Sequence, residues 1–303
     1  MISILIPVYN YDITSLINSL SAAIEDSEFY SEIIIGADGC DSSYIDSYNN
    51  LALLPGVKLH ISEKNIGRAS IRNQLAEKSK GSYLLFLDAD ALAQPDVKDF
   101  LSRYVDHLGV APVICGGTSY RDVPPDDPDK YLRWHYGFYR ERQDAKNRNK
   151  SPYASFSGFN FIIEKEILSR IKFNSELIKY GHEDTLFAYQ LMKAEVPIVH
   201  IDNSLIHDGL ETNQLYLLKT EESMQNLSLL YDKVTDRKGF ASAVRLLRRY
   251  NRLKLVGLTR LLARYYSRHG KKIKIKLSTH KASLTTFTLY KLSMFCYFRF
   301  NYN

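Results

Sequence analysis

Short apolar runs alternate with longer mixed stretches along the first third of the chain. The runs cover residues 2–7, 33–37, 57–61 and 83–87. Between them, residues 13–24 and 69–78 repeat apolar side chains at helical spacing. Strands that alternate with helices in this way are typical of βαβ units, which build a parallel sheet. The pattern therefore predicts an α/β fold in which helices flank a mainly parallel central sheet.

Polar or small residues follow three of these runs directly. They are Tyr9-Asn10 after the first run, Asp38-Gly39 after the second and Asp88-Ala89-Asp90 after the fourth. The carboxyl ends of parallel strands meet at one edge of a sheet, and open α/β sheets bind their ligands there. We therefore expect these residues to converge on one crevice that binds a nucleotide.

The pattern changes further along the chain. Residues 110–208 are less regular, with strand-like runs at 113–117 and 196–202 and helical stretches at 164–171 and 183–193. Helical spacing returns at 220–231 and in a longer basic helix over 240–268. We expect a main domain over residues 1–220, with halves 1–110 and 111–220, and a mostly helical C-terminal region over 221–303.

Charge divides the chain at Arg237. All 34 acidic residues precede this position, whereas 17 of the 40 Lys and Arg residues lie from it onward. Basic amphipathic segments lie on anionic membrane surfaces. We therefore expect residues 237–303 to bind a membrane surface peripherally. Val244, Leu247, Leu255, Leu258, Leu262 and Tyr265 form an apolar stripe on one helical face, for which a homo-oligomer or partner interface is the alternative. Nucleic acid is a less favoured partner for the charges.

The cysteines and the N-terminus bear on the compartment. Cys40, Cys115 and Cys296 are odd in number and far apart, which argues against a disulfide framework. The chain begins with an apolar run that lacks the basic start and cleavage site of a signal peptide, and no apolar stretch reaches about 18 residues. We expect a cytoplasmic protein, peripheral on the inner face of the cell membrane.

The tripeptide Asp88-Ala89-Asp90 carries the strongest chemical signal. Two carboxylates at a strand end can hold a divalent ion against a diphosphate, since Mg²⁺ uses one or two protein carboxylates together with phosphates and water. Aspartates at such positions also serve as caps or solvated loop residues. The apolar run that precedes them, residues 83–87, favours the metal site.

Six motifs occur in the order found in one enzyme family. They are residues 6–10, Asp38-Gly39, residues 65–69 with Arg72-Asn73, the aspartate pair, Ser157-Gly158-Phe159-Asn160 and Gly181-His182-Glu183-Asp184. Through these motifs about 210 residues resemble the family 2 glycosyltransferases. The resemblance implies a Rossmann-like GT-A fold and an inverting enzyme. Such an enzyme moves a sugar from a nucleotide diphosphate, here a UDP-sugar, to an acceptor hydroxyl with Mn²⁺ or Mg²⁺.

The resemblance assigns the nucleotide site. It implies that Pro7, Tyr9 and Asp38 flank the base and ribose, and that Gly67 and Arg68 approach the nucleotide. The same site takes Asn10, Asn73, Asp88 and Ala89. Asp38 can equally be a turn former before Gly39, and residues 65–67 can cap the helix that follows.

The metal ligands follow in the same way. Asp90 is expected to contact the ion directly, whereas Asp88 contacts the ribose or binds the ion through water. In many relatives a later histidine completes the metal site, and His207 stands at that position, with His200 as its competitor.

The resemblance also assigns the acceptor side. Asp184 is the candidate general base, with Glu183 as the alternative, and either can simply be a first-turn residue favoured by the helix dipole. Gly158 and Asn160 are expected to bind the acceptor. Trp134 can stack on a sugar or anchor the core.

The biological role expected from these features is the synthesis of bacterial surface polysaccharide or lipid-linked glycan. A nucleotidyltransferase is an alternative, although its usual Gly-rich loop and lysine do not resemble residues 7–10. A non-catalytic sugar or nucleic-acid binding module is the third reading. A dehydrogenase is disfavoured because no Gly-x-Gly-x-x-Gly follows the first strand.

Overall fold

The computed structural model describes residues 1–25, 27–92, 97–176, 181–279 and 282–301. Its contacts divide the chain into two compact units. The first unit consists of Met1–Ser119, Arg142–Ile178 and Leu186–Gly209. The second unit consists of Tyr120–Glu141, Lys179–Thr185 and Leu210–Asn303. We predicted a single boundary at residue 220. Each unit instead consists of three segments that are separated in the sequence.

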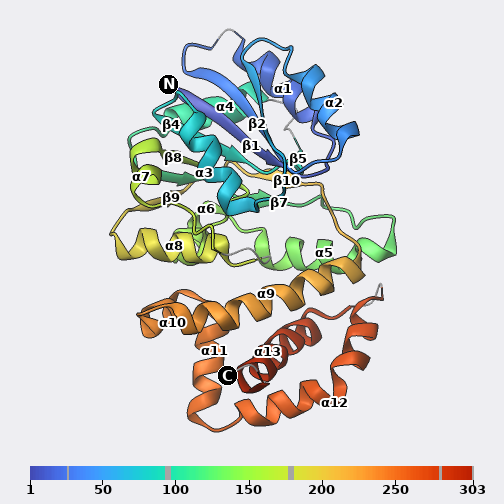
Figure 1. Cartoon of the computed structure of the whole chain (residues 1–303). Coiled ribbons are helices and arrows are strands. Elements are labelled where there is room, and N and C mark those ends of the chain that lie inside the picture. The colour runs from blue at the N-terminus through green and yellow to red at the C-terminus, as the bar shows by residue number, and fades with distance from the viewer. Residues whose placement is uncertain (26, 93–96, 177–180, 280–281, 302–303) are drawn as a thin grey trace. The chain divides into compact units, whose positions relative to one another are not determined.

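A seven-stranded sheet forms the centre of the first unit, in the order β3-β2-β1-β4-β8-β6-β9 (Figure 1). The strands are β1 Ile2–Val8, β2 Tyr30–Asp38, β3 Val57–Ser62, β4 Tyr83–Leu87, β6 Val113–Cys115, β8 Asn160–Glu164 and β9 Ile198–His200. The first four strands are parallel. Strand β8 runs antiparallel to both β4 and β6, and β9 is parallel to β6. The predicted mixed, mainly parallel sheet is confirmed.

Helices cover both faces of this sheet, as the pattern predicted. The helices with residues in the core cluster on one face are α1 Thr14–Ile24, α2 Ser42–Leu51 and α4 Val97–Asp106. Those with residues in the cluster on the other face are α3 Arg68–Lys78, α7 Lys165–Arg170 and α8 Glu183–Lys193. Along β1, Ile4 and Ile6 join the first cluster and Leu5 the second. Because both faces are covered, β1 is buried along its whole length, which explains its unbroken apolar run.

A second, three-stranded sheet lies beyond the end of β4. Its strands, in the order β5-β10-β7, are β5 Ala91–Leu92, β10 Leu205–His207 and β7 Thr118–Ser119. Strand β10 is antiparallel to β5 and parallel to β7. These strands are too short to show an apolar period, so the sequence predicted none of them as a sheet.

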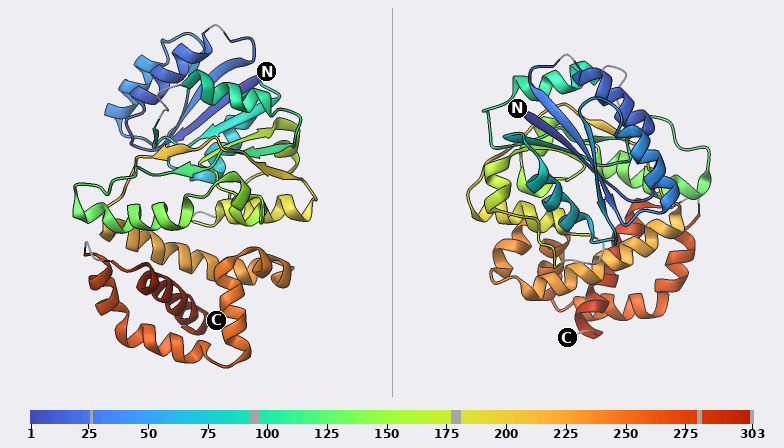
Figure 2. Two further views of the ribbon diagram at one scale, coloured as in Figure 1. Left: turned by 180° about the vertical axis from the view of Figure 1, so that it is seen from behind. Right: turned by 45° about the horizontal axis from the view of Figure 1, so that its top comes forward.

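Helices make up most of the second unit (Figure 2). They are α5 Tyr131–Tyr136, α9 Asn213–Lys233, α10 Arg237–Ala243, α11 Arg245–Leu255, α12 Thr259–Leu277 and α13 Leu284–Asn301. Helix α13 packs along α12 and α9. The expected helical C-terminal region is confirmed. No helix among the described residues is both long enough and apolar enough to cross a bilayer.

The single helix expected over residues 240–268 is wrong, because the chain breaks there twice. Val244 is extended, with φ −106° and ψ 114°, and separates α10 from α11. Gly257 has φ 73° and separates α11 from α12. Glycine adopts this left-handed conformation without the steric penalty that a side chain brings. Residues 240–268 therefore fall in three helices, α10, α11 and α12, rather than one.

Short helical segments complete the described chain. They are η1 Pro128–Lys130, η2 Gly137–Glu141, α6 Ala145–Arg148 and η3 Tyr153–Ser155.

Candidate functional site

Asp90 and His207 lie opposite each other in the first unit. Strand β5 begins directly after Asp90, and its Ala91 pairs with His207 at the end of β10. The N–H of Asp208 donates to the carbonyl oxygen of Asp90 at 3.0 Å. The Oδ2 of Asp90 lies 3.4 Å from Nε2 of His207. The short antiparallel ladder thus brings together two side chains that are far apart in the sequence.

Close packing holds this pair in place. The ring of Phe159 stacks on the imidazole of His207, with centroids 5.5 Å apart and planes 21° from parallel. A Cβ atom on Gly209 would lie 2.5 Å from Oδ2 of Asp90, so only glycine lets the backbone approach this carboxylate so closely. The carboxylate is therefore confined on the side of residue 209.

The pair fits the requirements of a divalent ion. Two ligands bound at about 2.1 Å and at a right angle stand about 3 Å apart, close to the 3.4 Å between Asp90 Oδ2 and His207 Nε2. No group of three or more His, Cys, Asp or Glu side chains among the described residues could hold a metal. A site with two protein ligands suits an ion that completes its shell with water and phosphate oxygens, as Mg²⁺ does.

Asp88 is oriented by a buried arginine on α3. Nη2 of Arg72 donates to Oδ1 of Asp88 at 2.7 Å and to the carbonyl oxygen of Gly158 at 3.4 Å. The N–H of Asp88 donates to the carbonyl oxygen of Phe159 at 3.0 Å. The segment that contains Gly158 therefore lies beside Asp88. Sequence reasoning included Arg72 in a motif but gave it no role, although it follows Arg68 by one helical turn and so lies on the same side of α3.

Asp38 holds the loop that precedes α3. Its Oδ1 accepts a hydrogen bond from the N–H of Ile66 at 2.7 Å, and its Oδ2 accepts one from Gly67 at 3.0 Å. Burial raises the pKa of the Asp38 carboxyl, and the two N–H donors oppose that rise. Gly67, with φ 86°, is the residue directly before α3. Arg68 is exposed in the first turn of the helix, so Asp38 fixes the loop that presents Arg68.

The loop after β1 is tied to the loop after β2. Asn10 has φ 46°; its Nδ2 donates to Asp41 Oδ2 at 2.9 Å, and its Oδ1 accepts from the N–H of Asp41 at 2.8 Å. Tyr9 is exposed, whereas Pro7 is buried within β1 and Ala89 is half-buried. Asn10 therefore links the loop after β1 to the loop after β2.

Tyr11 is a residue near the site that sequence reasoning missed. Burial, together with the negative charges of Asp90 and Asp208, raises the pKa of its hydroxyl. The tyrosine therefore stays protonated beside the carboxylates and can donate a hydrogen bond. It follows the motif residues Tyr9 and Asn10 in the sequence, which is the only signal that could have identified it.

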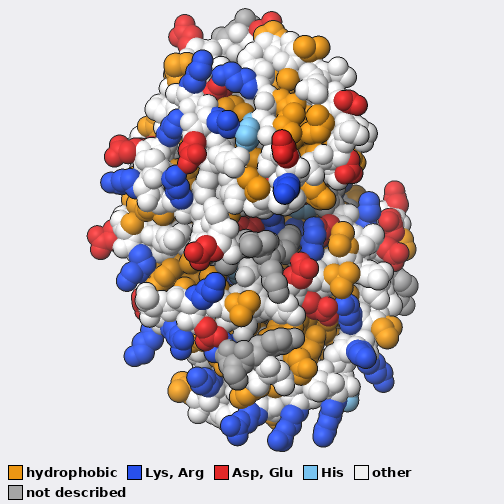
Figure 3. All heavy atoms as spheres, viewed as in Figure 1, with side chains coloured by type: hydrophobic (Ala, Val, Ile, Leu, Met, Phe, Trp, Pro, Cys, Tyr) orange, Lys and Arg blue, Asp and Glu red, His pale blue; other side chains and the backbone are white. Residues whose placement is uncertain are grey.

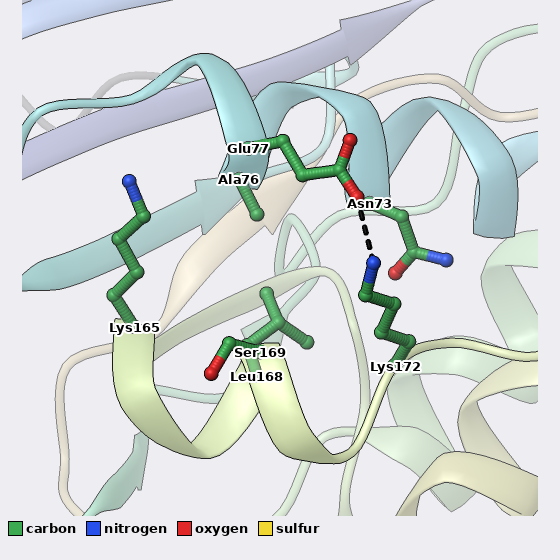
Figure 4. A pocket seen from close by; sticks show the side chains of 7 residues that line it. All are labelled: Asn73, Ala76, Glu77, Lys165, Leu168, Ser169 and Lys172. Carbon is green, nitrogen blue, oxygen red and sulfur yellow. Dashed lines mark hydrogen bonds and ion pairs between the residues drawn. The ribbon is translucent and has the colours of Figure 1, made fainter.

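The side-chain amides of Asn73 and Asn160 form hydrogen bonds to other groups of the protein. Nδ2 of Asn73 donates to the carbonyl oxygen of Phe173 at 2.8 Å, and its Oδ1 accepts from the N–H of Phe173 at 3.1 Å. Asn73 also lines a surface hollow between α3 and α7, where Lys172 and Glu77 form an ion pair at 2.7 Å (Figure 4).

Asn160 is buried, and its side chain makes three hydrogen bonds within the first unit. Its Oδ1 accepts from the Tyr104 hydroxyl at 2.6 Å. Its Nδ2 donates to the carbonyl oxygens of Gly117 at 3.1 Å and Asn203 at 2.8 Å. These bonds join the start of β8 to helix α4 and to the loops that follow β6 and β9. The side-chain amide of Asn160 therefore stabilises the edge of the sheet beside the candidate site.

His200 is a structural histidine. Nε2 of its buried ring lies 3.0 Å from the carbonyl oxygen of Pro152, and burial lowers its pKa to about 4. The ring is therefore neutral at physiological pH, and its Nε2–H is the donor to Pro152.

The second unit holds the remaining candidates. Trp134 is buried, and its Nε1 donates to the carbonyl oxygen of Arg121 at 2.9 Å, which is an anchoring contact. Glu183 and Asp184 form the first turn of α8, where carboxylates are favoured by the helix dipole. Glu183 is buried and Asp184 half-buried.

Two left-handed residues lead into this turn, Gly181 with φ 93° and His182 with φ 72°. The carbonyl oxygen of Gly181 accepts a hydrogen bond from Nδ2 of Asn226 on α9. Nδ1 of His182 lies 3.2 Å from Oγ1 of Thr185. Burial, followed by the charge of Lys291, lowers the pKa of His182 to about 4, so the imidazole beside the two carboxylates is neutral.

The fold, the aspartates at the end of β4 and the order of the motifs define a glycosyltransferase of the GT-A type. The chain belongs to glycosyl transferase family 2, whose family model matches residues 3–171. An uncharacterized glycosyltransferase of Haemophilus influenzae is 35% identical over 91 residues, which is 30% of this chain. That match spans only 36% of the length of the relative. The predicted family and enzyme class are confirmed.

Solved structures support the fold. The mannosyltransferase PcManGT from Pyrobaculum calidifontis, in complex with GDP-Man and Mn²⁺, has a TM-score of 0.55 at 14% identity. That comparison covers 97% of this chain and 85% of PcManGT. Residues 1–349 of S. aureus TarS have a TM-score of 0.50 at 15% identity, with coverage of 99% and 90%.

Proposed function

We propose that this glycosyltransferase moves a sugar from UDP to an acceptor hydroxyl with inversion at the anomeric carbon, using Mn²⁺ or Mg²⁺. The observation that carries the proposal is the Asp90–His207 pair beside Asp88, at the carboxyl edge of the sheet. The product is a bacterial surface polysaccharide or a lipid-linked glycan. In this proposal residues 1–110 bind the donor and residues 111–220 the acceptor.

Asp90 and His207 would hold the ion, which when bound stabilises the negative charge of the departing diphosphate. Asp88 contacts the ribose or a water on the ion, and Arg72 fixes its orientation through the 2.7 Å bond. Gly67 and Arg68 present the N-terminus of α3 and a guanidinium, both of which attract phosphate.

The acceptor side supplies the base. A carboxylate in the first turn of α8, Asp184 or its neighbour Glu183, takes the proton of the acceptor hydroxyl. The acceptor oxygen then forms a bond to the anomeric carbon while the bond from that carbon to the diphosphate breaks. The electron pair of the broken bond leaves with the nucleotide, so charge and protons balance. The neutral His182 adds no positive charge that would weaken the base.

The choice of UDP comes from the family resemblance alone. PcManGT, which shares the fold, binds GDP-Man and Mn²⁺. That complex supports a nucleotide sugar and a divalent ion, and it makes GDP the competing nucleotide.

A donor screen tests the proposal. The full-length chain is incubated with UDP-sugars or GDP-sugars and Mn²⁺, and nucleotide release is measured with and without chelator. We expect release from a UDP-sugar that stops on chelation.

Asp184→Asn should lose turnover and still bind the nucleotide, whereas Asp90→Asn should lose metal-dependent binding. Asp106→Asn, at the exposed end of α4, is the control and should behave as wild type. Release from GDP-sugars alone would contradict the nucleotide, and metal-independent release would contradict the mechanism.

The proposal extends to residues 237–303, which would bring the enzyme to the anionic inner face of the cell membrane. Seventeen cations and no acid in this stretch support it. Self-association through the same region is the rival proposal. Sedimentation with anionic vesicles at low salt tests the membrane, and sedimentation velocity without lipid tests the oligomer.

A further inference from the structure

The turn between α11 and α12 carries an unusual cluster of exposed apolar side chains. Leu255 is 88% exposed, Val256 67% and Leu261 63%, and Leu258 is exposed as well. We call Leu255, Val256, Leu258 and Leu261 the apolar tip. Single exposed apolar residues are common on protein surfaces, whereas four within seven consecutive positions form a patch that needs a reason.

Hydrogen bonds make this turn a defined structure. The N–H of Gly257 donates to the carbonyl oxygen of Lys254 at 3.2 Å, and the N–H of Leu258 donates to that of Leu253 at 3.0 Å. Together with φ 73° at Gly257, these two bonds form a Schellman motif, a common way to end a helix. The apolar tip is therefore held outward by a folded turn.

Cations surround the apolar tip. Arg252 and Lys254 precede it, Arg260 lies between Leu258 and Leu261, and Arg264 follows it, all four of them exposed. The α11–α12 turn lies at the lower edge of Figure 1, and Lys and Arg side chains line that edge in Figure 3, over α12. No acidic residue occurs after Asp236 in the sequence. The surface thus combines exposed apolar side chains with charge of a single sign.

We propose that the apolar tip inserts into the boundary between headgroups and acyl chains of an anionic bilayer, while Arg252, Lys254, Arg260 and Arg264 bind lipid phosphates. This inference rests on the membrane association put forward above and deepens it, because it identifies the residues that enter the lipid. The C-terminal region is then attached by two forces, charge attraction and apolar burial. Salt screens the first and leaves the second nearly unchanged.

The charges favour lipid over a protein partner. The central part of a protein interface is depleted of Lys, Asp and Glu but enriched in Arg, so the single sign of the charge points to an anionic surface more than the presence of charge does. Here cations alternate closely with the apolar side chains. Long Arg and Lys side chains can extend from a shallowly inserted turn to the phosphates, so their charge does not have to leave the polar layer. An anionic bilayer satisfies both groups at once.

Three variants of the full-length chain test the inference. Leu255→Ser with Val256→Ser removes the two most exposed side chains of the apolar tip and keeps every charge. Ile275→Ser is the matched control, since Ile275 is 70% exposed on α12 but lies outside the tip. Val256→Trp places a fluorophore at the tip, and the chain's other tryptophan, Trp134, is buried. All three positions are exposed, so unchanged thermal unfolding confirms that each variant folds.

Binding is measured by sedimentation with vesicles of phosphatidylcholine and phosphatidylserine, and with vesicles of phosphatidylcholine alone, at low and at physiological salt. The double variant should partition at least about tenfold more weakly than wild type to the anionic vesicles. Ile275→Ser should bind as wild type does. The emission of Val256→Trp should shift to shorter wavelength with anionic vesicles and be quenched by brominated lipid.

Three results would overturn the inference, and each leaves a different part of the proposed function standing. If wild type and the double variant bind equally and the tryptophan emission does not move, charge alone holds the protein to the membrane. If wild type does not bind vesicles but still releases nucleotide from its donor, membrane association is lost and sugar transfer stands. If the double variant turns an oligomer into a monomer without changing vesicle binding, the apolar tip is a protein interface.

Discussion

The guanidinium of Arg72 and the carboxylate of Asp88 form a 2.7 Å ion pair in which only the carboxylate reaches solvent. The side chain of Arg72 is 1% exposed and that of Asp88 25% exposed. The guanidinium also lies over the ring of Phe173, with 5.5 Å between its carbon and the ring centroid. A buried guanidinium with fixed packing therefore orients a carboxylate at the candidate site. Helix α3 supplies this guanidinium and so connects the core to Asp88.

Removing this cation should affect both stability and donor binding. We expect Arg72→Gln to lower the free energy of unfolding by about 2 kcal/mol, because Asp88 loses a hydrogen bond from a charged donor, and to raise the KM for the donor more than it lowers kcat. Urea unfolding and initial rates measure the two effects. Arg103→Gln, which removes an ion pair that is about half exposed on both sides, should change stability by less than about 1 kcal/mol. Equal losses in the two variants would show that Arg72 has no special role.

A methyl group at residue 209 should disturb the metal site without changing a ligand. In Gly209→Ala the new Cβ would approach Oδ2 of Asp90 to 2.5 Å, so the carboxylate must move. We expect the Mn²⁺ concentration for half-maximal activity to rise at least about tenfold, as when the support of a ligand is lost. Gly109→Ala is the control, because its φ of 83° strains the backbone while nothing lies within 4 Å of its Cβ. It should lose stability and keep its metal response. An unchanged metal response in Gly209→Ala would place the ion elsewhere.

Two roles of the Asn160 side chain can be distinguished by mutation: stabilising the fold and binding the acceptor. If the amide acts through its bonds to Tyr104, Gly117 and Asn203, Asn160→Ala should destabilise the fold by about 3 kcal/mol. The KM for the acceptor should stay close to that of wild type in the folded fraction. Tyr104→Phe removes one of these bonds and should destabilise by about 1 kcal/mol. A stable Asn160→Ala with a raised acceptor KM would instead support the binding role expected from the sequence.

The helices and the longer strands of the fold could be predicted because their burial patterns appear in short stretches of sequence. Strands buried on both faces read as apolar runs, and helices on a sheet repeat apolar residues at helical spacing, so α1, α3 and α8 begin and end within one or two residues of the expected positions. The break at Gly257 was missed, since one glycine inside an amphipathic pattern weakens a helix without deciding its end. Its Schellman bonds depend on the conformation of the turn, which the apolar period does not encode.

The site was predictable to the extent that motifs locate strand ends. Asp90 and His207 were paired through a family resemblance, and a ladder of two residue pairs brings them together in the structure. The roles of Asn160 and Arg72 could not be predicted in this way. Their partners, such as Asn203 and Asp88, come from other strands, and burial decides whether an amide or a guanidinium faces a ligand or the backbone. The spacing of apolar residues along the chain carries no information about such a side-chain contact.

The buried histidines should make the protein less stable in mild acid. Burial lowers the pKa of His200 to about 4, below the value of about 6.5 in an unfolded chain. Between these two values the unfolded state binds a proton that the folded state does not, so stability is complete above about pH 6.5 and falls as the pH drops toward 4. For a shift of this size at one histidine the loss is at most about 3.4 kcal/mol.

His200→Gln keeps an amide donor for Pro152 and removes the titrating ring, so its urea midpoint should fall less steeply over this range than that of wild type. His269→Gln, on the exposed face of α12, should keep the wild-type slope. Equal slopes in all three proteins would mean that His200 accepts a proton without cost in the fold.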